Sequence, residues 1–480
     1  MESRLDQAVV TGLFMTVAFT ALAHGTVEPW SVGIFRLMMT VLLVIWIVRS
    51  VIEGELVLTI ASTLRPVMAF FVLGLAQCLS FTDSGGHLRA LSVNVEATRM
   101  TVATFFFILA GGVMAATFLV GPERLQMVAR TLVIYGMALS LFALVQNFAW
   151  SGSFYWLRPL TWEASSVFGP FVNHNHFAGY VELLIPLPIA LIVTGAVRGA
   201  ERLFYGFAAA LMGVAVVFTL SRGGIISLLA QLILIALLGR RVAREREAER
   251  YSDWKDEQPG RIPSVVAAFL SRVGAVAAIS LVILVGIFWI DAEPVIQRVT
   301  RGQMLSAEAA PQTETFFSSR GWIWKDTLKM IRANPVSGVG LGAYATAYPI
   351  YSGSDELNVS QAHNDYLQVL ADGGFIGGAI AVWFLIAVFQ AIRRSCRARD
   401  PLLAGLALGC STAIVGLLIH SLFDFNLQLP STSLLFLIMT AILSHLATAA
   451  TEKASLENRA SIRNINEGRR GQGGFGSFAE

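Results

Sequence analysis

The stretch from Pro401 to Phe423 reads PLLAGLALGCSTAIVGLLIHSLF and contains no Asp, Glu, Lys or Arg. A helix of about 20 apolar residues crosses a hydrocarbon core roughly 30 Å thick. Similar stretches recur along all 480 residues, of which 55% are hydrophobic and 14% charged, at a mean hydropathy of +0.64. The sequence therefore predicts an all-α integral membrane protein.

Hydropathy predicts about twelve transmembrane helices. We expect them near residues 8–24, 31–52, 65–82, 99–120, 128–150, 171–197, 202–220, 222–239, 266–290, 375–392, 401–423 and 430–449. The chain then divides into helices within 1–290, one large loop with short surface helices over 291–374, further helices within 375–450, and a disordered tail over 451–480.

Basic residues orient these helices, because loops rich in Lys and Arg stay in the cytoplasm. They concentrate in the connector 240–261, in the connector 393–399 and in the tail. With twelve spans, all three segments lie on one side. We therefore expect a multi-pass protein of a bacterial inner membrane, with both termini cytoplasmic and the loop 291–374 in the periplasm. Ala21-Leu22-Ala23 is similar to a signal-peptidase site, so retention of the first helix stays open.

Four polar clusters interrupt the apolar background, and this topology places all of them on the outer side. They are Asn173-His174-Asn175-His176, Ser221-Arg222-Gly223-Gly224, Ser319-Arg320 and His363-Asn364-Asp365-Tyr366. Ser318 and Ser319 are expected to cap a surface helix over about 320–333, and a second short helix is expected from His363 to Gly373-Gly374. Residues far apart in sequence thus converge on one membrane surface.

Arg222 and Arg320 are candidates for binding a diphosphate. Guanidinium presents a planar fork of donors that matches phosphate oxygens. An arginine between two apolar spans, such as Arg222, is a functional-site hypothesis by default. The alternatives are a topology anchor that snorkels to the interface for Arg222 and a solvated loop residue for Arg320.

His363 is a candidate general base, because histidine titrates near neutral pH. A structural histidine is the alternative. The Asn-His-Asn-His run can bind sugars, and a His-x-His metal pair is the competing interpretation, although no third ligand lies nearby in sequence. His420 and Asp424 lie one turn apart and could form a polar floor or an interhelical hydrogen bond. Cys78, Cys396 and Cys410 share no metal-ligand spacing, and we expect no disulfide.

Together these clusters resemble the O-antigen ligase and polymerase superfamily of membrane glycosyltransferases. The matching stretches are Gly169–Ala178, Leu220–Gly223, Ser319–Trp324 with Asn334-Pro335 and Gly338–Gly340, and Ala362–Leu367. The resemblance implies a metal-independent, inverting enzyme without a cofactor, whose donor is an undecaprenyl-diphosphate-linked glycan. It implies that Arg222 and Arg320 bind the donor diphosphate and that His363 accepts the proton of the acceptor hydroxyl. We expect the remaining substrate contacts from Asn173, His174, Asn175, His176, Asn364, Tyr366, His420 and Asp424.

The acceptor stays open. A ligase transfers the glycan to lipid A-core, a polymerase transfers it to another lipid-linked repeat unit of an O-antigen or exopolysaccharide, and related enzymes use protein serine. Membrane lipids are the other expected partners, and a net charge of +3 is too small to suggest nucleic acid. Two other classes compete: a transporter of a glycan or lipid, which would show internal symmetry and charges at the bilayer midplane, and a scaffold without activity.

Overall fold

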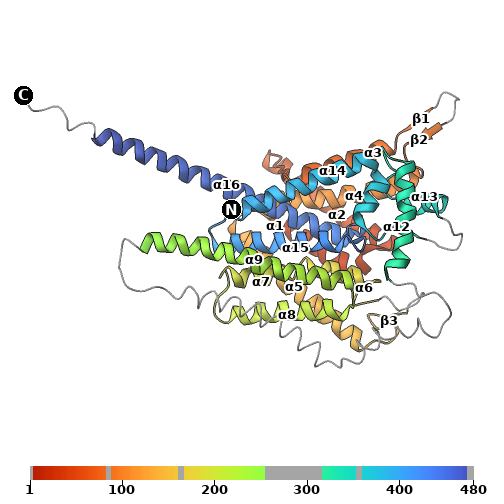
Figure 1. Ribbon diagram of the computed structural model, residues 1–480, viewed down its shortest axis with the longest axis horizontal. Helices are drawn as coiled ribbons and strands as arrows, with labels where there is room; N and C mark the ends of the chain where they lie inside the picture. Colours follow the sequence, from red (N-terminus) through yellow and green to blue (C-terminus); the bar gives the residue numbers. More distant parts are fainter. Residues whose placement is uncertain (1–3, 83–87, 160–166, 255–315, 353–358, 473–480) are drawn as a thin grey trace, which may run out of the picture.

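The computed structural model describes residues 4–82, 88–159, 167–254, 316–352 and 359–472, and these residues are nearly all helical (Figure 1). The helices are α1 (Arg4–Leu22), α2 (Pro29–Glu53), α3 (Leu64–Gln77), α4 (Val95–Phe118), α5 (Pro122–Phe148), α6 (His174–Glu182), α7 (Pro186–Val193), α8 (Glu201–Phe218), α9 (Arg222–Trp254), α12 (Phe316–Ala333), α13 (Tyr344–Tyr351), α14 (Asp365–Ser395), α15 (Pro401–His420) and α16 (Pro430–Gln472), with 3-10 turns η1 (His24–Thr26) and η3 (Asn426–Gln428). Two antiparallel hairpins complete the described part: β1 (Ser80–Thr82) with β2 (Leu88–Ala90), and β3 (Ser153–Phe154) with β4 (Arg158–Pro159).

Ten helical segments of the described chain are long and apolar enough to cross a membrane, and α3 is a shorter apolar helix. The all-α membrane fold is therefore confirmed. The count of twelve is not, because the span predicted at 266–290 lies outside the described residues. The sixth predicted span, 171–197, contains Pro186 and Pro188, and the chain there divides into α6 and α7 with a break at residues 183–185.

Helix α15 lies inside the bundle, packed on α7, α9 and α16. Small residues allow this approach: a Cβ at Gly409 would lie 3.1 Å from Leu187 Cα, and one at Gly405 would lie 3.3 Å from Leu191 Cα. Helices in lipid associate through such backbone contacts, since hydrocarbon gives no hydrophobic force between them. The close packing fixes both ends of α15, and its C-terminal end carries His420.

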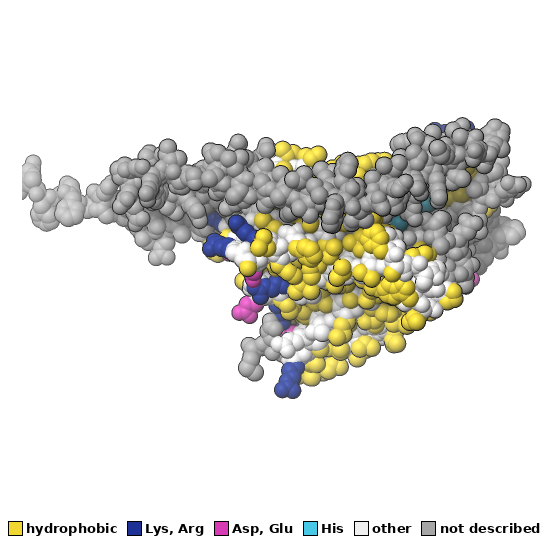
Figure 2. Space-filling model, turned by 90° about the horizontal axis from the view of Figure 1, so that it is seen from below, with side chains coloured by type: hydrophobic (Ala, Val, Ile, Leu, Met, Phe, Trp, Pro, Cys, Tyr) yellow, Lys and Arg dark blue, Asp and Glu magenta, His cyan; other side chains and the backbone are white. Residues whose placement is uncertain are grey.

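The two ends of the bundle differ in character. The β1–β2 hairpin, α12 and α13 lie at one end, which we name the α12 end, whereas α9 and α16 run away from it (Figure 1). At the opposite end Arg49 pairs with Asp6 at 2.6 Å, and Arg124 lies 3.6 Å from Asp6, which joins α1, α2 and α5. Figure 2 shows Lys, Arg, Asp and Glu side chains gathered at this end beside a broad hydrophobic band. These ion pairs therefore lie at the end of the bundle away from α12.

A small second core holds the α12 end together. Met330, Val339, Tyr344, Tyr348 and Ala371 are buried against one another. The turn Gly338–Gly342 hydrogen-bonds to α14, with Val339 N donating to Ala371 O at 2.9 Å. This turn therefore ties the chain after α12 to α14.

Three sequence-based expectations need correction here. Helix α12 begins at Phe316, so Ser318 and Ser319 lie inside its first turn and do not precede it as caps. The second short helix does start near His363, but it continues as α14 through a kink at Gly374, where φ is 59° and a Cβ would lie 2.4 Å from Val336 O. Residues 451–472, expected in a disordered tail, continue α16 as helix.

Candidate active site at the α12 end

Asp424 is the centre of a cluster of polar side chains at the α12 end. It follows the C-terminal end of α15 and is 1% exposed. Its Oδ1 lies 3.4 Å from His363 Nδ1 and 3.9 Å from His176 Nε2, and its Oδ2 lies 3.7 Å from Arg320 Nη2. Three predicted motifs therefore meet at one carboxylate.

The charge of Asp424 is held by these neighbours. Burial alone would raise the pKa of Asp424, but the hydrogen bond from His363 and the Coulombic attraction of His176, His363 and Arg320 outweigh burial and lower this pKa below its ordinary value. Asp424 is therefore ionised at neutral pH. Because an ionised carboxylate only accepts hydrogen bonds, His363 Nδ1 carries the hydrogen, which leaves Nε2 as the basic nitrogen.

His363 is positioned by the residues on both sides of it. Its φ is +48°, in the left-handed region that non-glycine residues rarely adopt. The next residue, Asn364, caps α14: its Oδ1 accepts from the backbone N–H groups of Tyr366 and Leu367, each at 3.0 Å. The His363 ring packs edge-to-face on Phe425 with centroids 4.9 Å apart. Backbone strain that persists in this way is common at functional sites.

Asp365 connects His363 to the segment that carries Asp424. Its backbone N–H donates to Ser421 O at 2.9 Å, and its Oδ2 accepts from Ser421 Oγ at 2.8 Å and from Leu427 N at 3.1 Å. The turn 421–427 is thus tied to the start of α14, so the distance between His363 and Asp424 is set by backbone contacts and does not depend on that pair alone.

Arg320 contacts the same turn from α12, and the first residues of α9, next to Arg222, pack on it. Arg320 Nη1 donates to Phe423 O, beside its contact with Asp424. Arg222 is the exposed first residue of α9, and Ser221 caps that helix by accepting from Gly224 N at 3.1 Å. A Cβ at Gly223 would lie 2.7 Å from His420 and 3.3 Å from Phe423 Cβ, so the start of α9 packs on the turn that Arg320 contacts.

His420 and Glu182 form a second buried pair next to this turn. His420 Nδ1 lies 3.2 Å from the Glu182 carboxylate, and both side chains are almost fully buried. The sequence analysis singled out His420 but missed Glu182. The available signal was a carboxylate inside an apolar span, which is rare unless it is paired or functional.

Several predicted substrate-binding residues have structural contacts. Asn173 caps α6 by accepting from Asn175 N at 2.9 Å, and Asn364 Nδ2 donates to Leu422 O at 3.0 Å. Tyr366 donates its hydroxyl to Leu418 O at 2.8 Å. His174 and Asn175 are half-buried on the first turn of α6, next to His176. Roles of these five side chains in sugar binding stay predictions.

Within the described ranges, no group of three or more His, Cys, Asp or Glu side chains is arranged to hold a metal ion. His176 lies beside Asp424, and neither of its ring nitrogens has a hydrogen-bond partner among the described atoms. Because neutral imidazole can both donate and accept, this buried ring next to the cluster is available to a polar group of a substrate. Metal independence stays a prediction.

The comparisons with known proteins agree with the motifs. No curated protein matches the chain. Residues 207–382 match the family model described as O-antigen ligase, a range that contains Arg222, Arg320 and His363. This match supports the resemblance to the O-antigen ligase superfamily seen in the sequence, and the ten candidate spans make the chain a multi-pass membrane protein.

Proposed function

We propose that this protein is a glycosyltransferase of the O-antigen ligase kind, which moves a glycan from an undecaprenyl-diphosphate-linked donor to an acceptor hydroxyl. The observation that carries the proposal is the contact of His363 and Arg320 with one buried carboxylate, at 3.4 Å and 3.7 Å. A base and a cation held side by side are what transfer from a diphosphate leaving group requires. The family match supports glycan transfer independently.

In the proposed reaction, His363 Nε2 takes the proton of the acceptor hydroxyl while the hydroxyl oxygen attacks the anomeric carbon of the donor. The bond from that carbon to the diphosphate oxygen breaks, and the diphosphate leaves with the electron pair. Attack from the face opposite the leaving group inverts the anomeric carbon. Asp424 holds the tautomer of His363 and stabilises the imidazolium that forms, as a carboxylate does in a hydrolytic triad.

Arg222 and Arg320 are the proposed ligands of the departing diphosphate. Negative charge grows on the bridging oxygen in the transition state, and positioned guanidinium groups stabilise it. A guanidinium has five N–H donors. The described contacts of Arg320 with Phe423 and Asp424 orient the fork of donors. These two side chains would supply the positive charge that a divalent metal supplies in other glycosyltransferases.

The proposed orientation places the α12 end in the periplasm and both termini in the cytoplasm of the inner membrane. The charged cluster of Asp6, Arg49 and Arg124 at the opposite end supports this orientation under the positive-inside rule.

The test is glycan transfer by purified protein, reconstituted with a lipid-linked donor and analysed for product size. We expect His363→Ala to lower transfer by about 10²- to 10⁴-fold, the usual contribution of a general base. Arg222→Lys and Arg320→Lys should each lower it as well, since ammonium lacks the planar fork. Lys325→Arg, at an exposed position on α12, is a matched control for Arg320→Lys. Near-normal transfer by His363→Ala would remove it as the base.

A further inference from the structure

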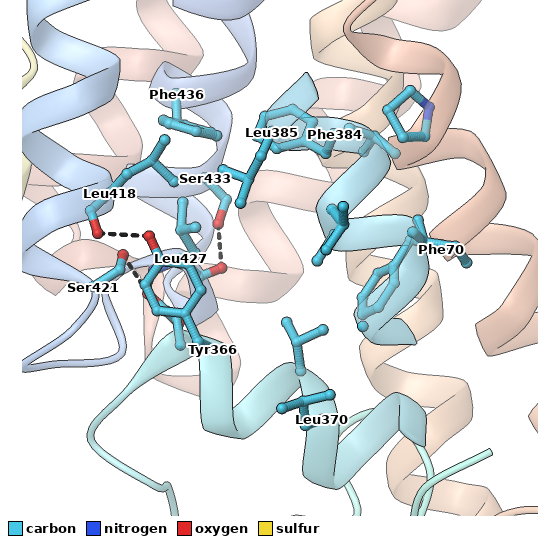
Figure 3. Close-up of a pocket in the computed structure, with 18 of the residues that line it drawn as sticks. Phe70, Tyr366, Leu370, Phe384, Leu385, Leu418, Ser421, Leu427, Ser433 and Phe436 are labelled. Carbon is cyan, nitrogen blue, oxygen red and sulfur yellow. Dashed lines mark hydrogen bonds between the residues drawn. The ribbon is translucent and has the colours of Figure 1, made fainter. Parts of the chain in front are cut away.

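Two cavities adjoin the candidate active site. The first, named here the polar cavity, has a volume of about 490 Å³ and is lined by Thr26, Thr101, Thr104, Ser360, Gln361 and Asp372 among others. The second, named the apolar cavity, has a volume of about 450 Å³ and lies between α3, α4, α14 and α16. Figure 3 shows Phe70, Leu370, Phe384, Leu385 and Phe436 around it. Both volumes fall within the roughly 300–1,000 Å³ of typical ligand sites.

The two cavities are neighbours with a common wall. Phe70, Phe105, Ile108, Val369, Leu427, Gln428 and Ser433 line both of them. One cavity offers hydroxyl, amide and carboxylate groups, and the other offers almost only hydrocarbon. A single molecule with a polar head and an apolar chain could therefore occupy both.

The polar cavity is lined by residues that neighbour the candidate catalytic base. Its lining includes Gln361, two residues before His363, and Phe425, directly after Asp424. The Phe425 ring packs on the His363 ring with centroids 4.9 Å apart. Phe425 thus contacts both the polar cavity and the His363 ring.

Unsatisfied polar atoms point to a sugar as the ligand of the polar cavity. Asp372 is 3% exposed, and its Oδ1 has no hydrogen-bond partner among the described atoms. Gln361 Oε1 also has no hydrogen-bond partner among the described atoms. Buried acceptors without partners are costly, and sugar hydroxyls are donors that would satisfy them. Among the described residues that line either cavity there is no Lys or Arg, so neither cavity offers a cation to a diphosphate.

We propose that the polar cavity binds the saccharide of the acceptor and that the apolar cavity binds the hydrocarbon chain of the same molecule. The inference rests on the proposed function. The donor diphosphate binds at Arg222 and Arg320, and the acceptor reaches His363 from the side of Phe425. Because the cavities share a wall, the reacting sugar must be close to its own lipid anchor. The preferred acceptor is a glycolipid with a short head, such as a single lipid-linked repeat unit, and a long lipid A-core is disfavoured.

The first experiment locates the site without requiring turnover. The protein in vesicles is labelled with dodecyl glucoside that carries a diazirine at the end of its alkyl chain, and the labelled peptides are identified by mass spectrometry. We expect label on the α14 segment 378–385 that lines the apolar cavity. Leu385→Trp fills the cavity and should remove this label, whereas Phe389→Trp, on the exposed lipid face one turn later, should retain it. Equal labelling of all three proteins would overturn the proposed chain site.

The second experiment tests acceptor choice with the lipid-linked donor held constant. Polyprenyl-phosphate-linked mono- and disaccharides are compared with purified lipid A-core. We expect Val32→Trp, in the wall of the polar cavity, to raise KM for the short acceptors by at least about tenfold, with KM for the donor nearly unchanged. Leu37→Trp on the exposed face of α2 is the control. Gln361→Leu removes the unpartnered Oε1 with little change in volume, and it should also raise KM for the acceptor.

The outcomes separate the two proposals. Suppose that the wild-type protein cleaves the donor but uses long and short acceptors equally, and that neither Val32→Trp nor Gln361→Leu changes KM for the acceptor. This result would overturn the acceptor site and leave the proposed function intact. If the wild-type protein never cleaves the donor, the proposed function fails. The photolabel then still decides whether the cavities bind a glycolipid.

Discussion

Replacing Asp424 by asparagine tests the centre of the proposed site. The carboxylate contacts His363, His176 and Arg320 at 3.4, 3.9 and 3.7 Å, and it is 1% exposed. Asparagine has nearly the same shape but no charge. A hydrogen bond to a charged group contributes about 1.5–3 kcal/mol. If this whole energy is gained only in the transition state, when the His363 ring becomes charged, its loss lowers kcat roughly ten- to hundredfold, because each factor of ten in rate corresponds to about 1.4 kcal/mol.

The assay is the rate of glycan transfer by reconstituted Asp424→Asn at saturating donor, with thermal unfolding followed in the same detergent. Asp400→Asn is the matched control, because Asp400 caps α15 at the opposite end of the bundle and asparagine caps equally well. We expect a large fall in kcat for Asp424→Asn and little change for Asp400→Asn. A rate for Asp424→Asn within twofold of wild type would refute the reasoning.

Three other predictions follow from single contacts. Gly223→Ala should lower transfer, because its Cβ would lie 2.7 Å from His420, whereas Gly321→Ala on α12 meets nothing within 4 Å and should leave the rate unchanged. Asn364→Ala should destabilise the start of α14 by about 0.5–2 kcal/mol, measured by thermal unfolding, and Asn364→Asp should restore the cap. The folded protein holds the pKa of Asp424 below the ordinary Asp value of about 3.9, so the ionised carboxylate stabilises the fold at pH values above about 3.9. This stabilisation is lost as pH falls from there through the lower pKa of the folded protein. The free energy of unfolding of Asp424→Asn should therefore fall less than that of the wild type between neutral pH and pH of about 3.

The sequence predicted the membrane fold because hydropathy depends only on local composition. The length of each apolar run identified most of the helices, and basic residues separated the two ends before any contact was known. The ends of helices were less accurate. Helix α12 begins before Ser318 and Ser319, although serine favours a cap. Contacts with α13 and α14 decide which face of α12 is buried, and periodicity alone does not contain them.

The candidate site was predicted in part. The motifs correctly brought Arg320 and His363 together, but Asp424 was expected as part of a polar floor, as a partner of His420 or as a substrate contact, whereas the structure makes it the common partner of His363 and Arg320. Glu182 was missed, since a single carboxylate in an apolar run gives no indication that it faces His420 across the bundle. Asn364 and Tyr366 lie in a strong motif, and their contacts are with backbone groups of the same protein. A short polar motif does not distinguish residues that shape a site from residues that touch its ligand.

The most direct test of the central claim is release of undecaprenyl diphosphate by purified protein in EDTA, followed together with formation of the glycosidic bond. The proposed mechanism predicts one diphosphate released for each bond formed by the wild-type protein, and background release by His363→Ala. Release that requires an added divalent metal, or that continues at the wild-type rate in His363→Ala, would contradict a centre built from His363, Asp424 and the two arginines.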